Sequence, residues 1–332
     1  MNHNFQDVIG HKDIIQYIQN ALKTDTASHA YVLSGERGSG KKLLAELFAM
    51  GLQCEHLKKD GDVCGECRSC KQSIHGNQPD IIWLHHAKPG SISVDEIREQ
   101  INNDIVIKPY SSKHKVYIIP DAELMTPQAQ NALLKTLEEP PEYGIILLLT
   151  ENEQALLPTI RSRCIVLKLR NVKDTLIRKY LMEKLEVPDY KADVCTAFAQ
   201  GNLGKAIMLA QSEHFNEIRD HAIRLLQQID EMELYEMVEV LREIEAYKLE
   251  INYFLDILAI WYRDVLLYKA TKDPEKLVFS EQLKDIRKKA EKSSYEGIEI
   301  ILKSLDKAKV RLRANVNFEL TMELLLLTIK EN

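Results

Sequence analysis

A glycine-rich turn between an apolar run and a helical run constrains the fold of this chain more than any other feature. Residues 31–34 read Tyr-Val-Leu-Ser, residues 35–42 read Gly-Glu-Arg-Gly-Ser-Gly-Lys-Lys, and residues 43–48 continue with helical periodicity. Glycines let backbone N–H groups approach a phosphate, and the helix N-terminus adds partial positive charge. The context predicts a phosphate-binding loop after a first strand; a glycine turn without a ligand is the alternative.

Four further apolar segments follow in the first half of the chain, at residues 81–84, 116–119, 145–149 and 165–167. Near-continuous apolar runs are typical of strands buried on both faces of a parallel sheet. Helix starts are legible between them. Ser93 and Glu96 form a capping-box pattern, and Thr126 before Pro127 gives an N-cap with a first-turn proline, in a helix that ends before Pro140. The alternation predicts an α/β fold with crossover helices.

After about residue 170 the strand pattern gives way to helical periodicity, as in the apolar series that starts at Ile251 and Phe254 and the one that starts at Ile298 and Ile301. Breaks between helices are expected at the Gly-Asn-Leu-Gly sequence of residues 201–204 and at Pro274. The second half is therefore predicted to be all-helical.

Length and composition suit a soluble globular protein of two or three domains, with 332 residues, 28% of them charged and 45% hydrophobic. The formal net charge of -6 argues against a protein that coats nucleic acid through bulk positive charge, although a local basic surface can still touch phosphates. The chain has no apolar run near the roughly 18 residues of a membrane span and no signal peptide, so we expect a cytoplasmic protein without membrane contact.

Four of the six cysteines form a C-x9-C-x2-C-x2-C pattern at Cys54, Cys64, Cys67 and Cys70. In a reducing compartment such a cluster indicates metal binding more readily than disulfides. Four thiolates complete the tetrahedral shell of Zn²⁺ and leave no position for water, which predicts a structural site. An iron–sulfur cluster is the main alternative, and unpaired buried thiols are another.

Two positions of the expected magnesium site carry unsuitable side chains. Lys42 stands where the phosphate-loop motif needs a Ser or Thr hydroxyl, and Pro120, after the strand at 116–119, stands where an acidic metal ligand is expected. Phosphoryl transfer depends on the metal to neutralise charge, so hydrolysis here should be very slow. Nucleotide binding through the loop amides and Lys41 does not need the hydroxyl and can persist.

Arg163 lies between the last two predicted strands, at the edge of the α/β unit. An arginine presented there can enter the ATP site of a neighbouring subunit and stabilise the transferring phosphate. A surface salt bridge is the alternative interpretation of the same residue.

Taken in order, these motifs resemble those of bacterial clamp-loader AAA+ subunits. The matching stretches are residues 5–11, 35–42, the four cysteines, and residues 129–141, 162–164 and 201–206. The resemblance spans about residues 5–210, and the rest agrees in length and helicity only. It implies an α/β AAA+ P-loop domain over residues 1–168 with a zinc module at 54–71, a small helical lid over 169–210, and an all-α C-terminal collar domain over 211–332 for oligomerisation.

The resemblance also implies a function and partners. A five-membered ring of subunits would open a sliding clamp and seat it on primed DNA as part of the DNA polymerase III holoenzyme, with motor (gamma/tau) and delta subunits as neighbours. In it Arg163 would serve a neighbouring ATP site in trans, and Val8 and Ile9 would flank adenine. Gly35, Gly38, Gly40, Lys41 and Lys42 would form the nucleotide loop. Arg98 falls where relatives contact DNA phosphate, and a solvated helix charge is its alternative.

Lys42 and Pro120 differ from the hydroxyl and the acid that a motor subunit carries at these positions. They favour the subunit type that does not hydrolyse ATP, whether or not it binds it, so we expect no autonomous ATPase activity. Lys205, where motor relatives often carry a sensing arginine, agrees with this. Two alternatives stay open. One is an ATP-hydrolysing motor subunit of the gamma/tau kind, and the other is a zinc-bearing adaptor that binds DNA directly and keeps the nucleotide fold as a scaffold.

Overall fold

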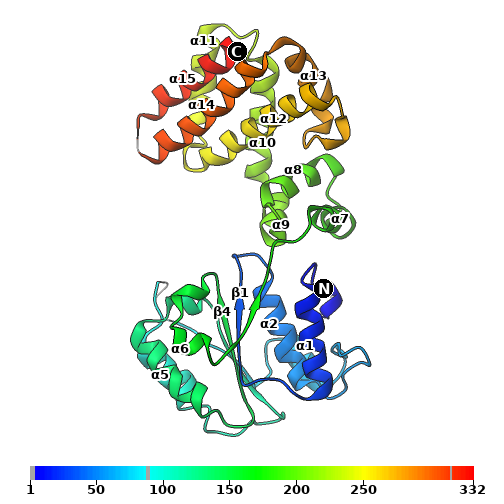
Figure 1. Cartoon of the computed structure of the whole chain (residues 1–332), viewed down its shortest axis with the longest axis vertical. Helices are drawn as coiled ribbons and strands as arrows, with labels where there is room; N and C mark the ends of the chain where they lie inside the picture. The colour runs from blue at the N-terminus through cyan, green and yellow to red at the C-terminus, as the bar shows by residue number, and fades with distance from the viewer. Residues whose placement is uncertain (1–3, 87–89, 315) are drawn as a thin grey trace. The chain divides into compact units, whose positions relative to one another are not determined.

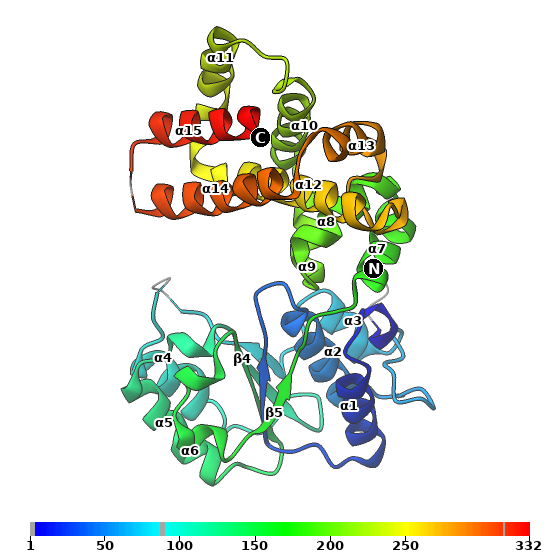
Figure 2. The same ribbon diagram turned by 45° about the horizontal axis from the view of Figure 1, so that its top comes forward.

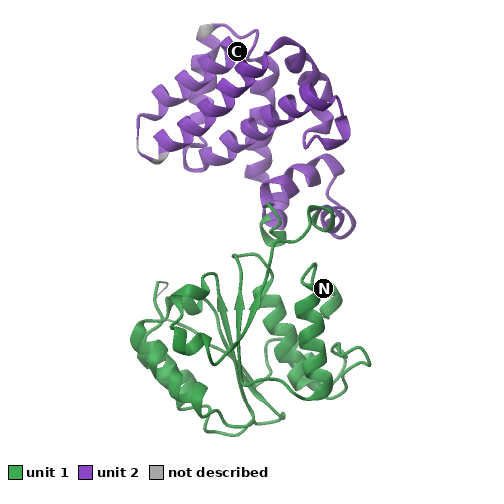
Figure 3. Cartoon of the chain, in the orientation of Figure 1, with its two compact units in different colours: residues 1–177, 200–205 green, residues 178–199, 206–332 purple. Residues whose placement is uncertain are grey.

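The computed structural model describes residues 4–86, 90–314 and 316–332 and separates into two compact units. Unit 1 contains residues 1–177 and 200–205, and unit 2 contains residues 178–199 and 206–332 (Figure 3). Because unit 2 takes residues from both the expected lid and the expected collar, the division into 169–210 and 211–332 stays a prediction.

A five-stranded parallel sheet forms the centre of unit 1, with strand order β2-β3-β4-β1-β5. The strands are β1 (Ala30–Ser34), β2 (Ile81–Trp83), β3 (Lys115–Ile119), β4 (Gly144–Thr150) and β5 (Ile165–Lys168). In the register of the central strand, Val32 lies opposite Leu148 on one side and Val166 on the other. All five apolar runs are therefore confirmed as strands of one parallel sheet.

Helices cover both faces of this sheet (Figures 1 and 2). Alternate residues of β1 divide between two cores: Tyr31 and Leu33 pack with α1 (Lys12–Thr24) and α2 (Lys41–Gln53). Ala30 and Val32 belong to the core on the other face. That face is covered by α4 (Val94–Ile97), the π-helical turn η2 (Arg98–Asn102), α5 (Pro127–Glu138) and α6 (Pro158–Arg161). Unit 1 also contains α3 (Arg68–Ile74), η1 (Phe5–Asp7), η3 (Ala122–Leu124) and η4 (Glu153–Ala155).

Both predicted helix starts in unit 1 are confirmed. Ser93 caps α4 with both hydrogen bonds of the capping box, and Glu96 is the reciprocal partner. The Thr126 hydroxyl accepts a hydrogen bond of 3.2 Å from the backbone N–H of Ala129. The helix α5 begins at Pro127 and ends at Glu138, before Pro140.

In its described part, the chain beyond β5 contains helices and turns and no strand, as predicted. The helices are α7 (Asp174–Leu185), α8 (Asp189–Ala199), α9 (Leu203–Gln211), α10 (Glu213–Gln228), α11 (Leu234–Glu245), α12 (Ile251–Thr271), α13 (Leu283–Lys292), α14 (Tyr295–Arg313) and α15 (Phe318–Glu331), with short 3-10 turns η5 (Lys248–Glu250), η6 (Pro274–Lys276) and η7 (Ser280–Gln282). In unit 2, α12 packs against α10, α13 and α14, and Phe254, Leu258 and Tyr262 of α12 are fully buried.

The predicted breaks are also confirmed, since Gly201 has a φ of +86° between α8 and α9 and Pro274 follows the end of α12. Within the described ranges, no helix combines the length and the apolar character needed to cross a bilayer.

Candidate functional sites

The glycine loop joins the carboxyl end of β1 to α2, at the edge of a parallel sheet where ligands usually bind. Gly38 and Gly40 have φ values of +85° and +96°, a region that residues with a Cβ rarely adopt. Gly40 is the N-cap of α2 and offers no side chain to the first N–H groups of the helix. These free N–H groups are the ones that donate hydrogen bonds to a phosphate bound at a helix N-terminus.

A cavity of about 720 Å³ opens over this loop and falls within the size range of small-molecule sites. Its lining comes from the loop, the start of α2 and the carboxyl ends of β2, β3 and β4: Arg37, Gly38, Gly40, Lys41, Lys42, Glu46, Trp83, Leu84, His85, Pro120, Asp121, Leu149 and Glu151. Four predicted nucleotide residues therefore meet in one cavity. Gly35 lies at the start of the loop, and Val8 and Ile9 are not part of the lining.

Lys41 folds back over the loop. Its Nζ donates to the carbonyl oxygens of Gly35 and, at 3.0 Å, of Glu36. Burial lowers the pKa of Lys41, and the nearby carboxylates of Glu151 and Glu123 act in the opposite direction. The ammonium is thus held at the loop, where it can meet a phosphate oxygen.

A side-chain donor and a backbone donor from residues 200–205 bind carbonyl oxygens of the loop. The buried amide of Asn202 donates to the Arg37 carbonyl at 2.7 Å, and the Gly204 N–H donates to the Gly38 carbonyl at 2.9 Å. The His11 Nε2 also lies 3.1 Å from the Ser39 carbonyl oxygen. None of these three residues was predicted to hold the loop, although His11 lies in the matching stretch 5–11 and Asn202 and Gly204 lie in the matching stretch 201–206.

Neither expected magnesium ligand is present at the cavity. Pro120 follows β3 directly and has no side-chain oxygen. The Lys42 Nζ lies 5.3 Å from the centre of the Trp83 ring, at the end of β2. Beyond Pro120, the carboxylate of Glu123 accepts a hydrogen bond from the Glu151 N–H at 3.1 Å, which directs it to the backbone.

Arg163 follows α6 and is bound within its own unit. Its Nη2 lies 2.8 Å from the Glu138 carboxylate at the end of α5, and its Nη1 donates to the Thr159 carbonyl at 2.9 Å. The side chain is 36% exposed. Arg98, at the start of η2, pairs with Asp95 at 3.7 Å and is more exposed, at 61%. An ion pair of this exposure is weak, so both guanidinium groups are accessible to a stronger anionic partner.

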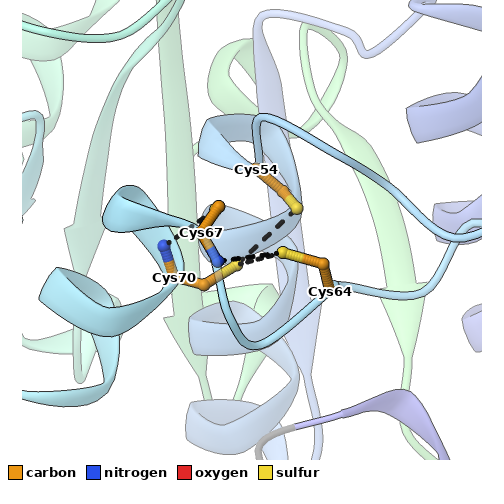
Figure 4. A group of neighbouring side chains, drawn as sticks. All are labelled: Cys54, Cys64, Cys67 and Cys70. Atoms are coloured by element: carbon orange, nitrogen blue, oxygen red, sulfur yellow. Dashed lines mark hydrogen bonds between the residues drawn. The ribbon is translucent and has the colours of Figure 1, made fainter.

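The four clustered cysteines converge around one point (Figure 4). Their sulfur atoms all lie within 4.8 Å of one another, and the Cys70 sulfur is 3.6 Å from Cys54 and 3.7 Å from Cys64. Tetrahedral zinc with Zn–S bonds of about 2.3 Å gives sulfur separations of about 3.8 Å. The four residues fit a metal ion such as zinc. Cys164 and Cys195 lie outside this cluster, and burial raises their thiol pKa to about 12 and about 11.

Backbone donors surround the sulfurs. The Glu66 and Cys67 N–H groups point to Cys64 Sγ at 3.5 and 3.3 Å, and the Cys70 N–H points to Cys67 Sγ at 3.4 Å. Hydrogen bonding from the Cys70 thiol lowers the pKa of Cys54 to about 5. Such donors stabilise thiolates, the form that binds metal.

The cysteine segment is also tied to the start of the chain. Asp62 is fully buried, and its Oδ1 accepts hydrogen bonds from the Phe5 N–H at 3.0 Å and the Val63 N–H at 2.8 Å. One carboxylate therefore joins η1 to the cysteine segment.

Comparisons with known proteins agree over both halves of the chain. A family model described as DNA polymerase III, delta subunit matches residues 10–173, and one described as DNA polymerase III, delta subunit, C terminal matches residues 212–331. The DNA polymerase III subunit delta' of Bacillus subtilis is 31% identical over 322 residues, which cover 96% of this chain and 95% of that protein. The DNA polymerase III subunit tau of the same organism is 29% identical over 96% of this chain, but only 60% of that protein is covered.

Among solved structures, a gamma subunit-related protein from Thermotoga maritima aligns with a TM-score of 0.45 at 21% identity, over 95% of this chain and 98% of that chain.

Proposed function

The chain belongs to the delta-prime family of DNA polymerase III clamp-loader subunits, and from that premise we propose that it assists ATP hydrolysis in a neighbouring subunit without hydrolysing ATP itself. Its partners in this proposal are motor (gamma/tau) and delta subunits, the sliding clamp and, through the complex, primed DNA. The helical region over residues 211–332 would hold the ring of subunits together.

The unsuitable magnesium site supports the first half of the proposal. Lys42 and Pro120 line the same cavity, and they occupy the two positions from which a hydroxyl and a carboxylate should coordinate the ion. Mg²⁺ requires near-ideal octahedral oxygen ligation, and a nearby ammonium repels it. Without the metal, charge on the transferring phosphate is not neutralised. The loop and Lys41 are compatible with bound ATP that is not turned over.

Arg163 supports the second half. The observation that carries it is a guanidinium just after α6 that, among the described residues, is held by a partly exposed carboxylate and one carbonyl oxygen. A partner's phosphate carries more negative charge than Glu138 and accepts two parallel hydrogen bonds from a guanidinium. Exchange of Glu138 for phosphate is therefore favourable in an assembled ring.

Clamp loading by a reconstituted complex tests whether Arg163 acts as an arginine finger, that is, as an arginine inserted into a neighbouring subunit's ATP site. With Arg163→Ala, we expect assembly to persist, loading to fail, and hydrolysis at the one served site to fall by about 10³-fold or more. Arg163→Lys should recover little, because lysine lacks the planar fork. Arg170→Ala removes another exposed charge of unit 1 and serves as the matched control. Unchanged loading by Arg163→Ala would exclude the finger.

Zinc is the metal we propose for the cysteine cluster, in a structural role. Four sulfur donors at near-tetrahedral separations leave no ligand position open, as in structural zinc sites. Metal analysis with an absorption spectrum distinguishes a colourless zinc protein from an iron–sulfur protein, which absorbs visible light.

A motor subunit is the second candidate, favoured by the similarity to subunit tau over 96% of this chain. It requires steady ATP turnover by the purified protein that Lys41→Ala abolishes. Lys42 and Pro120 oppose this candidate, and such turnover would contradict the proposal above.

A further inference from the structure

Lys42 is a charged residue of the cavity that the proposed function treats only as a defect. It stands in the first turn of α2, at the position that should hold the metal-binding hydroxyl, and its side chain is exposed. The ammonium lies over the Trp83 ring at 5.3 Å from its centre, and both residues line the cavity. A cation thus sits next to the place where a phosphate-bound metal would be.

Three cationic side chains line this cavity together, namely those of Arg37, Lys41 and Lys42. The carboxylates in the lining belong to Glu46, Asp121 and Glu151. Asp121 does not replace the acidic ligand lost at Pro120, because it lies one residue later, with a left-handed φ of +47° and its side chain exposed. The lining thus holds three cations and three carboxylates, and one of the cations occupies the position of the metal-binding hydroxyl.

The contact with Trp83 is one that a phosphate can displace. A lysine–tryptophan contact at an exposed site is weak, whereas an ammonium makes short, charge-assisted hydrogen bonds to phosphate oxygens. Lysine carries its charge on a flexible stem of four carbons, so the ammonium can leave the ring without moving the helix. Trp83 keeps the charge at the cavity until a ligand arrives.

We propose that the Lys42 ammonium takes the place of the divalent metal, so that this cavity binds the phosphate chain of a nucleoside triphosphate without Mg²⁺. The inference rests on the proposed function, in which ATP is held and not hydrolysed. It gives the site an inverted metal dependence: Mg²⁺ bound to ATP competes with Lys42 for the same phosphate oxygens, and therefore weakens binding or leaves it unchanged. An ordinary phosphate-loop site binds more tightly with Mg²⁺, because its hydroxyl and carboxylate coordinate the ion.

Equilibrium dialysis of the full-length chain against radiolabelled ATP, in excess EDTA and in excess Mg²⁺, tests this. The wild-type protein should bind ATP in EDTA at least as tightly as in Mg²⁺. Lys42→Thr, which restores the hydroxyl of the motif, should weaken binding in EDTA about tenfold or more, the loss expected for a charge-assisted hydrogen bond. It should also bind more tightly with Mg²⁺ than without.

Lys135→Thr, at an exposed position of α5, is the matched control and should bind as the wild type does. Inorganic triphosphate in place of ATP measures how much of the binding comes from the phosphate chain. Wild-type binding that requires Mg²⁺, equal binding by Lys42→Thr and wild type in EDTA, or no binding in either buffer would each overturn the inference.

Failure of the proposed function gives a different result. Normal clamp loading by the Arg163→Ala complex would remove the arginine finger and leave the dialysis data unaffected. ATP turnover by the isolated chain would remove the non-hydrolysing role, and it is measured as released phosphate, separately from the bound ATP that dialysis measures.

Discussion

At the scale of single residues, Asn202 and Gly204 fix the conformation of the phosphate loop. N–H groups that converge on a ligand are lost to the loop's own carbonyls. The Ser39 N–H donates to the Glu36 carbonyl at 3.1 Å, but the carbonyls of Arg37 and Gly38 take donors from outside the loop. Asn202 supplies one such donor at 2.7 Å and the Gly204 N–H another at 2.9 Å. Two segments far apart in the sequence thus meet backbone to backbone, and this leaves no room for a side chain at Gly204.

Gly204→Ala is expected to destabilise the protein for that reason. An added Cβ would lie 2.6 Å from both the Cα and the carbonyl oxygen of Gly38, which are backbone atoms that cannot rotate away. Overpacking of this kind costs about 1–3 kcal/mol in the free energy of unfolding. Urea unfolding measures it. Gly90→Ala is the control, since no atom of the described residues lies within 4 Å of its added Cβ. Equal losses in the two variants would show that the close approach to Gly38 is not the cause.

At the scale of elements, the proposed zinc ion should order the cysteine segment. Apart from α3 it has no regular secondary structure, and the small core beside it contains only Met50, Val63 and Cys70 as fully buried members. So little apolar burial cannot order a segment of this length, because the conformational entropy lost is larger. In the proposed zinc site, metal–thiolate bonds supply the difference.

Cys67→Ser should therefore lose the metal and the order of the segment together. We expect the zinc content to fall from one ion per chain to near zero, and proteases to cut within residues 54–70. Mass spectrometry of the metal and of the cleavage products measures both. Cys195→Ala, which changes a buried thiol outside the cluster, should keep its zinc. A Cys67→Ser protein that retains a full zinc ion would contradict the assignment of the ligands.

The N-cap of α5 offers a second test at this scale. Thr126→Ala removes the acceptor of the Ala129 N–H and should cost about 1 kcal/mol of stability. Thr126→Ser keeps the hydroxyl and should lose only a fraction of that amount. Chemical denaturation of the two variants separates the cap from the packing of the methyl group, and similar losses would mean that the methyl group matters more than the cap.

At the scale of the whole molecule, stability should fall as the pH drops below about 6.5. Burial is the main cause that lowers the pKa of His11 and of His114, and in His114 the Lys113 charge adds to it. A histidine with a lowered folded pKa binds fewer protons in the folded than in the unfolded state. Its neutral form stabilises the fold above the unfolded pKa, and this contribution is lost as the pH falls through the folded pKa.

Urea unfolding of the wild type and of His114→Gln between about pH 7.5 and 5 isolates this effect. The wild type should lose more stability than the variant across that range, because glutamine does not titrate. Parallel curves would show that protonation of His114 does not contribute. The carboxylates with lowered pKa, such as Asp25 beside Lys113, act only at more acidic pH and do not interfere.

Much of this protein follows from local patterns in its sequence. Apolar runs predicted all five strands, Ser93 and Thr126 predicted two helix starts, and the cysteine spacing predicted a cluster of four thiols that can hold a metal ion. Each of these depends on residues within one strand, turn or loop, where chain connectivity keeps the interacting groups near each other. The unsuitable side chains at the two expected magnesium-ligand positions, Lys42 and Pro120, could be recognised for the same reason. Each position is defined by the loop or strand that lies next to it in the sequence.

The tertiary structure alone decided which distant residues meet. Three contacts join separate segments of the chain. They are the ion pair of Arg163 with Glu138, the hydrogen bond from Asn202 to the Arg37 carbonyl and the contact of Lys42 with the Trp83 ring. These contacts depend on the strand order β2-β3-β4-β1-β5 and on which face each helix covers. Apolar runs of similar composition can pair in several orders, so their sequence does not specify this one; the packing of the complete core selects it.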